Sequence, residues 1–138
     1  MKKVYFITGS QHLYGKDIFT EINRHSAEIA NYLSGKLPAE AVALPVVTTK
    51  EEITNAFKAA NNDDDCVGVI TWMHTFSPSK MWIGGFKILH KPLLQLNTQY
   101  NRDIPWSEID MDFMNLNQSA HGDREHGYIT SRMNLKRK

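Results

Sequence analysis

The chain has 138 residues and a net charge of +1, which fits one compact domain and gives no reason to expect a nucleic acid or an anionic membrane as a partner. Its single cysteine, Cys66, excludes an internal disulfide. The short apolar run after Lys3 is not a signal peptide, and no window approaches the roughly 18–20 apolar residues of a membrane span. These features predict a soluble, cytoplasmic protein.

The first half of the chain alternates short apolar runs with amphipathic segments. Val4–Thr8 predicts a buried strand that ends at a glycine. The apolar positions of Ile18–Leu33 keep the helical repeat and predict a helix that Asp17 can cap. A second apolar run contains Pro45 and therefore predicts an edge strand or a strand end, and the capping box Thr49–Glu52 then opens another helix.

The second half continues the alternation. Val67–Met73 predicts a third strand, and Ser77–Pro78 places a capping residue before the first position of a helix that Gly84–Gly85 should weaken. Leu93–Asn97 predicts a fourth strand, and a last helix is expected from about Ser119 to Met133. The fold class predicted is α/β: a doubly wound, flavodoxin-like parallel sheet of about four strands with flanking helices, with the second strand at an edge.

Three compositionally unusual segments begin where predicted strands end, and ligands of such sheets collect at the carboxyl ends of the strands. The most unusual segment mixes Asn, Gln, Asp and His with Met and Phe, which is typical of a pocket that holds a polar ligand between apolar anchors. The three segments are Gly9–Gly15, Trp72–Pro78 and Asp110–Gly122.

The first segment invites comparison with a phosphate-binding loop. That motif has four residues between its glycines and a Lys followed by a hydroxyl residue. Here five residues separate Gly9 from Gly15, and Asp17 occupies the hydroxyl position, so a nucleotide site is not predicted. An ordinary strand-to-helix turn explains both glycines. It leaves Gln11 and Tyr14 without a purpose, whereas their amide and phenol groups can bond sugar hydroxyls.

Together the three segments resemble the N-terminal part of bacterial L-arabinose isomerases, over nearly the whole chain. The resemblance implies conversion of L-arabinose to L-ribulose, an aldose–ketose isomerisation, by a cytoplasmic, oligomeric enzyme of arabinose catabolism. Members of that family are several times longer. Residues 1–138 are therefore expected to form a single N-terminal domain that lacks its final strand and the metal-binding and catalytic domains, and to be inactive alone.

The resemblance also implies substrate contacts, none of them catalytic. The first segment lines the sugar pocket, and Phe76 supplies an apolar wall against the carbon face of the sugar. Gln118 and His121, which can share one helical face, bind the sugar in the pocket of a neighbouring subunit. On the residues alone, this pair can also belong to an ordinary helix cap. The implied contacts are Gln11, Leu13, Tyr14, Phe76, Gln118 and His121.

The six histidines offer no H-x-x-x-H spacing, so no metal site is predicted. His25 and His90 are expected on helical or turn surfaces, and His74 as a hydrogen-bonded structural residue. Trp72 and Trp82 are expected to pack in the core. In the arabinose isomerases the divalent metal, typically manganese, is held by Glu and His residues from the later part of the chain, so no cofactor is expected on this one.

Two other classes of protein remain open. One is a flavodoxin-like module that binds a sugar without transforming it, which sugar binding by this chain without metal would favour. The other is a receiver-like interaction domain, ranked last because such domains need acidic residues where this chain has Thr8–Gln11. The partners expected are L-arabinose and either further copies of the chain or a downstream portion that completes the enzyme.

Overall fold

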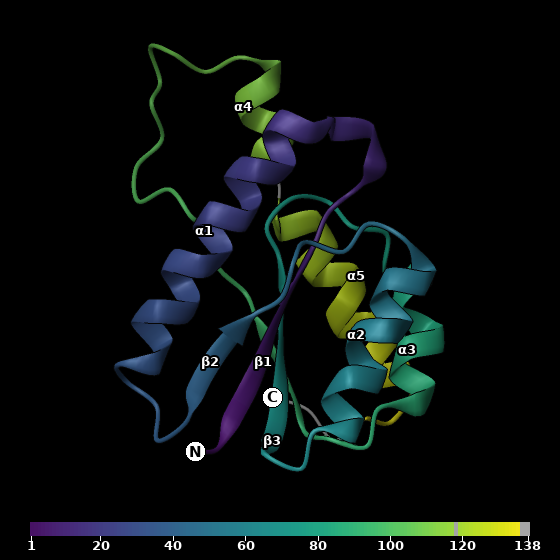
Figure 1. The fold of residues 1–138 in the computed structure, drawn as a ribbon. Coiled ribbons are helices and arrows are strands. Elements are labelled where there is room, and N and C mark those ends of the chain that lie inside the picture. The colour runs from purple at the N-terminus through teal and green to yellow at the C-terminus, as the bar shows by residue number, and fades with distance from the viewer. Residues whose placement is uncertain (118, 136–138) are drawn as a thin grey trace.

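The computed structural model describes residues 1–117 and 119–135, apart from the side chains of residues 14 and 119–121. Its centre is a four-stranded parallel sheet (Figure 1). The strands, in the spatial order β2-β1-β3-β4, are β1 (Lys3–Gly9), β2 (Glu40–Ala43), β3 (Cys66–Met73) and β4 (Leu93–Leu96). The parallel α/β fold and the edge position of the second strand are thus confirmed.

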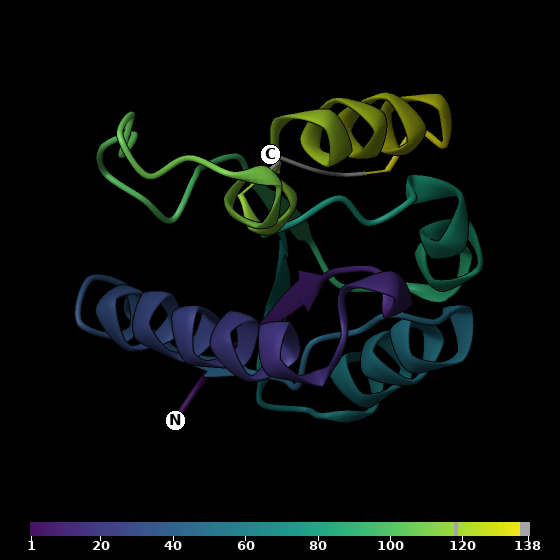
Figure 2. The ribbon, with the colours of Figure 1, turned by 90° about the horizontal axis from the view of Figure 1, so that it is seen from above.

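Helices connect the strands and continue beyond the last one. The α-helices are α1 (Lys16–Ser34), α2 (Lys50–Asn62), α3 (Ile83–Ile88), α4 (Met111–Leu116) and α5 (Ser119–Arg132). Two short 3₁₀ turns are η1 (His12–Tyr14) and η2 (Ser79–Trp82). Helix α1 covers one face of the sheet, and α2, α3 and α5 cover the other (Figures 1 and 2).

Alternating side chains of the strands feed a separate core on each face, because successive residues of a strand point to opposite sides. Phe6 and Trp72 pack on the face of α1, whereas Ile7 and Met73 pack with α2, α3 and Trp82. Neither Trp72 nor Trp82 has exposed surface, which confirms both as packing residues.

Two details differ from expectation near the first helix. Strand β2 ends at Ala43, before Pro45, and Val47 returns to the sheet only by an isolated bridge to Gly9. Proline lacks the N–H that a continuous ladder needs. The prediction that Asp17 caps α1 is wrong: Gly15, with φ of 83°, is the N-cap, and Asp17 lies within the first turn.

The prediction that Ser77 caps a helix is also wrong: Pro78 is the N-cap of η2, without a side-chain cap bond, and the Ser77 hydroxyl accepts from Trp82 Nε1 instead. The start of α2 follows its sequence signal. The Thr49 hydroxyl accepts the Glu52 N–H at 3.1 Å, as the capping box predicts. Helix α3 is only six residues long. Gly85 is required there, because a Cβ at this position would lie 2.7 Å from Cε2 of Phe57 on α2. Gly85 therefore permits the close approach of α3 to α2.

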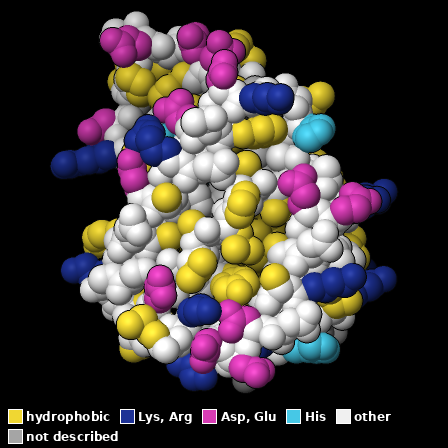
Figure 3. Space-filling model, viewed as in Figure 1, with side chains coloured by type: hydrophobic (Ala, Val, Ile, Leu, Met, Phe, Trp, Pro, Cys, Tyr) yellow, Lys and Arg dark blue, Asp and Glu magenta, His cyan; other side chains and the backbone are white. Residues whose placement is uncertain are grey.

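Residues 97–117 form a long excursion beyond β4, and none of them is buried. The excursion ends in α4, a helix that the sequence analysis did not predict, capped by the Asp110 carboxylate at the Phe113 N–H. Hydrophobic and acidic side chains are exposed on this part of the molecule (Figure 3). Among the described residues, no helix combines the length and apolar character needed to cross a membrane.

Candidate functional site

Two of the unusual segments meet at the carboxyl end of the sheet. They follow β1 and β3, which pair as far as their last residues, so both segments leave the sheet side by side. A buried hydrogen bond joins them, because Ser10 Oγ lies 2.6 Å from Thr75 Oγ1. Gln11 and Phe76, one residue further along each segment, therefore start from neighbouring positions at this edge. Both side chains are half-buried.

The remaining predicted contacts of the first segment lie in η1. Leu13 is 87% exposed, so it makes no contribution to the core of this chain. The side chain of Tyr14 lies outside the described residues. The neighbouring His12 is anchored through Nδ1, 3.0 Å from the Thr48 hydroxyl, which ties η1 to the residues before α2.

The start of α5 brings the third segment to the same edge. A Cβ on Gly122 would lie 3.2 Å from Cβ of Met73 and 3.6 Å from the backbone nitrogen of Ser77. The first turn of α5 therefore lies against the segment that carries Phe76. Gln118 and the side chain of His121 lie outside the described residues, so their contacts stay a prediction.

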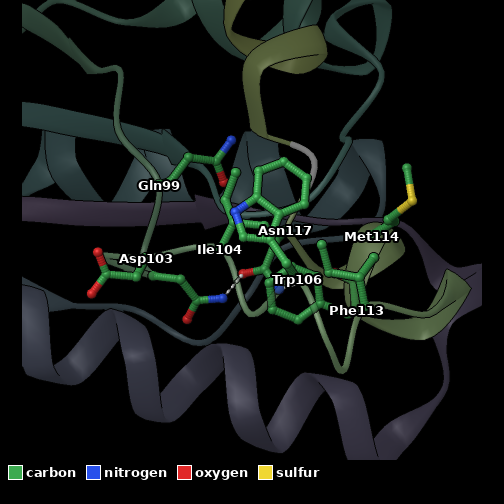
Figure 4. Close-up of a pocket in the computed structure, with 9 residues that line it drawn as sticks. Gln99, Asp103, Ile104, Trp106, Phe113, Met114 and Asn117 are labelled. Atoms are coloured by element: carbon green, nitrogen blue, oxygen red, sulfur yellow. Dashed lines mark hydrogen bonds between the residues drawn. The ribbon is translucent and has the colours of Figure 1, made fainter.

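Two hollows open near this end of the molecule. The larger, of about 470 Å³, lies within the excursion 97–117, where Trp106 and Phe113 face it and Asn101 Nδ2 donates to Asn117 Oδ1 at 3.1 Å (Figure 4). The other, of about 400 Å³, lies between the first turn of α1 and α4. Neither hollow is lined by Gln11, Leu13 or Phe76.

His25 is buried, so the prediction that it lies on a helical surface is wrong. Its spacing from Ile22 and Ile29 is three and four residues, which puts all three on the apolar face of α1 and could have revealed its position. His25 Nδ1 lies 2.6 Å from Nε2 of His74, just beyond β3. His74 is confirmed as a hydrogen-bonded structural residue.

The two histidines are neutral at neutral pH. Burial, together with the nearby His25, lowers the pKa of His74 to about 4. Burial and the Arg24 guanidinium lower the pKa of His25 as well. This pair thus has a fixed hydrogen-bonding pattern.

A row of buried polar residues on α5 also escaped the sequence analysis. Asp123, His126 and Thr130 recur at helical spacing but are buried on the sheet side, where apolar residues are the rule. Asp123 Oδ1 accepts from Gln95 Nε2 at 2.6 Å, and Gln95 in turn accepts from the Thr71 hydroxyl at 2.7 Å. Burial raises the pKa of Asp123 to about 6.

His126 has a different environment. Its ring stands edge-on to Trp82 and Phe86, and neither ring nitrogen has a hydrogen-bond partner among the described residues. Burial therefore lowers the pKa of His126 to about 3. The helical repeat of Asp123, His126 and Thr130 could have indicated that they share one face of α5. Because their side chains are polar, that face resembles a solvent-exposed one in the sequence.

The described residues do not fit a metal centre. Within residues 1–117 and 119–135, apart from the side chains left undescribed, no three His, Cys, Asp or Glu side chains gather closely enough to hold an ion. No chemical step through a metal is derived from this chain.

Comparison with known proteins identifies the domain. The family model of the L-arabinose isomerase N-terminal domain matches residues 1–138. An L-arabinose isomerase of Shouchella clausii is 60% identical over 134 residues, which are 97% of this chain and 28% of the relative. An L-arabinose isomerase of Bacteroides thetaiotaomicron is 59% identical over 138 residues, covering 99% of this chain and 27% of the relative.

A third relative, from Geobacillus thermodenitrificans, is also named L-arabinose isomerase and is 59% identical, over 97% of this chain and 27% of its own length. The chain spans little more than a quarter of the length of these relatives. The resemblance inferred from the three unusual segments is confirmed. The chain therefore belongs to the L-arabinose isomerase N-terminal domain family.

Proposed function

We propose that this chain is the substrate-recognition and subunit-packing domain of a cytoplasmic L-arabinose isomerase, which converts L-arabinose to L-ribulose. The observation that carries the proposal is the identity of about 60% across almost all of the chain to proteins of that name. Residues 1–138 would then act as a single domain of a larger enzyme. Its contribution is to bind and orient the sugar.

Six residues are proposed as substrate contacts. The junction of Ser10 and Thr75 supports this, because it starts Gln11 and Phe76 from adjacent points at the edge where ligands of parallel sheets bind. Gln11 offers an amide for sugar hydroxyls, and Phe76 an apolar wall for the carbon face. The full set is Gln11, Leu13, Tyr14, Phe76, Gln118 and His121.

The exposure of Leu13 supports a site that is completed by another polypeptide. Leu13 is 87% exposed in this chain, so its side chain is free to contact a second subunit or a further domain. Gln11, Leu13 and Phe76 line neither hollow of this chain, which also suits a pocket that another polypeptide completes. We therefore propose that the sugar is held between this domain and another part of an oligomeric enzyme.

The isomerisation moves a hydrogen between C1 and C2, which requires a base for the proton and stabilisation of charge on the oxygens. We assign both to parts of the enzyme outside this chain, where Glu and His residues would hold a divalent metal such as manganese. The metal would stabilise the charge on the substrate oxygens. The residues of this chain would exclude water and fix the orientation of the sugar.

A chimaeric enzyme tests the proposal. Residues 1–138 would replace the matching part of the Shouchella clausii enzyme, and L-ribulose formation would be measured with and without manganese. We expect the chimaera to be active and the 138-residue chain alone to form no L-ribulose. A folded but inactive chimaera would refute the proposal, and sugar binding by the chain alone would then favour a non-catalytic sugar-binding module.

A further inference from the structure

The buried histidine pair forms a directed chain of hydrogen bonds. His74 Nδ1 lies 3.0 Å from the carbonyl oxygen of Leu116, which can only accept, so this nitrogen carries the hydrogen. His74 Nε2 must then accept from Nδ1–H of His25, 2.6 Å away. His25 Nε2 in turn accepts from Nη2 of Arg24 at 3.0 Å. Every group has a matching partner only when both rings are neutral.

The chain of bonds ends on the excursion 97–117. No residue of the excursion is fully buried, and Tyr100 packs half-buried against the core on the face of α1. The ring of Tyr100, near the start of the excursion, stacks on His25 with centroids 3.4 Å apart. Leu116, near its end, is bonded to His74. One pair of histidines therefore contacts both ends of the excursion.

Other contacts reinforce the start of the excursion. The Tyr100 hydroxyl donates to Glu28 Oε2 at 2.6 Å, and Trp72 Nε1 donates to the carbonyl oxygen of Thr98 at 3.0 Å. At the end, Asn117 is held by Asn101 of the same excursion. The bond from His74 ties Leu116, at the end of α4, to the segment directly after β3.

We propose that His25 and His74 are positioning residues: their directed hydrogen bonds hold the excursion 97–117, which leads in the sequence to the proposed sugar contacts Gln118 and His121. The inference rests on the proposed function, because it assigns a purpose to holding the excursion that precedes these contacts. The pair does not touch the sugar. Its effect is on sugar affinity.

The arrangement predicts a dependence on pH. A proton on His74 Nε2 would face the N–H of His25 and break the bond between them. Around His25, the charged and titratable groups are Arg24, Glu21 and Glu28 of α1, with Tyr100 and His74. Because the pKa of His74 is lowered to about 4, positioning is present at neutral pH and is lost as the pH falls through that value.

The first test uses the 138-residue chain and needs no sugar. Nitrogen NMR at pH 7 is expected to show both rings neutral with the hydrogen on Nδ1, and His74→Phe is expected to accelerate amide exchange in 113–117 at least tenfold. His126→Phe removes a buried ring whose nitrogens have no hydrogen-bond partner in the described part of the chain, and it should leave that exchange unchanged. Hydrogen on Nε2 of His74, or unchanged exchange in His74→Phe, would overturn the inference.

The second test measures kinetics in the chimaera. His74→Phe is expected to raise KM for L-arabinose about fivefold or more with kcat little changed, since the coupling affects binding and not the chemical step. The amide of Asn in His74→Asn can still donate to the Leu116 carbonyl, so KM for L-arabinose should rise less in this variant than in His74→Phe. An active chimaera in which His74→Phe leaves KM unchanged overturns the inference alone, whereas an inactive parent chimaera refutes the proposed function.

Discussion

Replacing Trp82 by alanine is expected to lower the free energy of unfolding by about 4 kcal/mol, because it removes a buried aromatic ring and leaves a cavity. Trp82 has no exposed surface, and its ring lies against Phe86 and His126. Its Nε1 also donates to Ser77 Oγ at 3.0 Å, which anchors the segment after β3. The substitution should therefore weaken both the core and one wall of the candidate site.

Urea unfolding followed by circular dichroism measures this loss. Trp106→Ala is the matched control, because Trp106 is 81% exposed and its removal should change the free energy of unfolding by no more than about 0.5 kcal/mol. Trp82→Phe keeps an aromatic ring and should lose less than Trp82→Ala. Equal losses for Trp82→Ala and Trp106→Ala would contradict the packing described for α3 and α5.

Acid is expected to destabilise the domain well above the pH at which most carboxylates become protonated. His74 and His126 have pKa values of about 4 and about 3 in the fold, against 6.5 ordinarily. As the pH falls below 6.5, these two histidines bind protons in the unfolded chain but not in the folded chain, so the free energy of unfolding decreases. Asp123, with its pKa raised to about 6 from 3.8, opposes this by favouring the fold as it is protonated.

Together these groups are expected to lower the free energy of unfolding by about 3 kcal/mol between pH 7 and pH 4.5, because the effect of the two histidines is larger than that of the one carboxyl group. Urea unfolding at both pH values measures it. His126→Phe should remove most of the loss, and Asp123→Asn should make the loss larger by removing the opposing group. Equal stability of the parent chain at the two pH values would contradict the neutral, buried state of the histidines.

The order of the elements could be predicted because each depends on local signals. The apolar runs, the capping box at Thr49 and the proline in the second run each act within a few residues. Helix α4 was missed because it is six residues long and buries none of them, so it has no amphipathic pattern. The early end of β2 followed from Pro45, which the sequence analysis placed within a longer run.

The sequence could predict where the candidate site lies on the sheet, but not which buried side chains pack behind it. Two strands that end side by side bring Gln11 and Phe76 to one edge, and that follows from topology alone. The burial of His25 and His126 depends on what packs over their helices. Only the tertiary structure brings Tyr100 onto the ring of His25 or Trp82 against His126. The helical spacing of these residues indicates which face of the helix they occupy, but not which side chains pack over them.

We propose that the sheet edge formed after β1 and β3 contacts the sugar, and kcat/KM of the chimaera for L-arabinose measures that contact. Phe76→Ala is predicted to lower kcat/KM about tenfold or more, because burial of an aromatic ring against the substrate is worth roughly 1.5–3 kcal/mol. Tyr32→Ala, which removes an exposed ring near the C-terminal end of α1, should leave it unchanged. If kcat/KM is the same for Phe76→Ala, Tyr32→Ala and the parent chimaera, this edge does not bind the substrate.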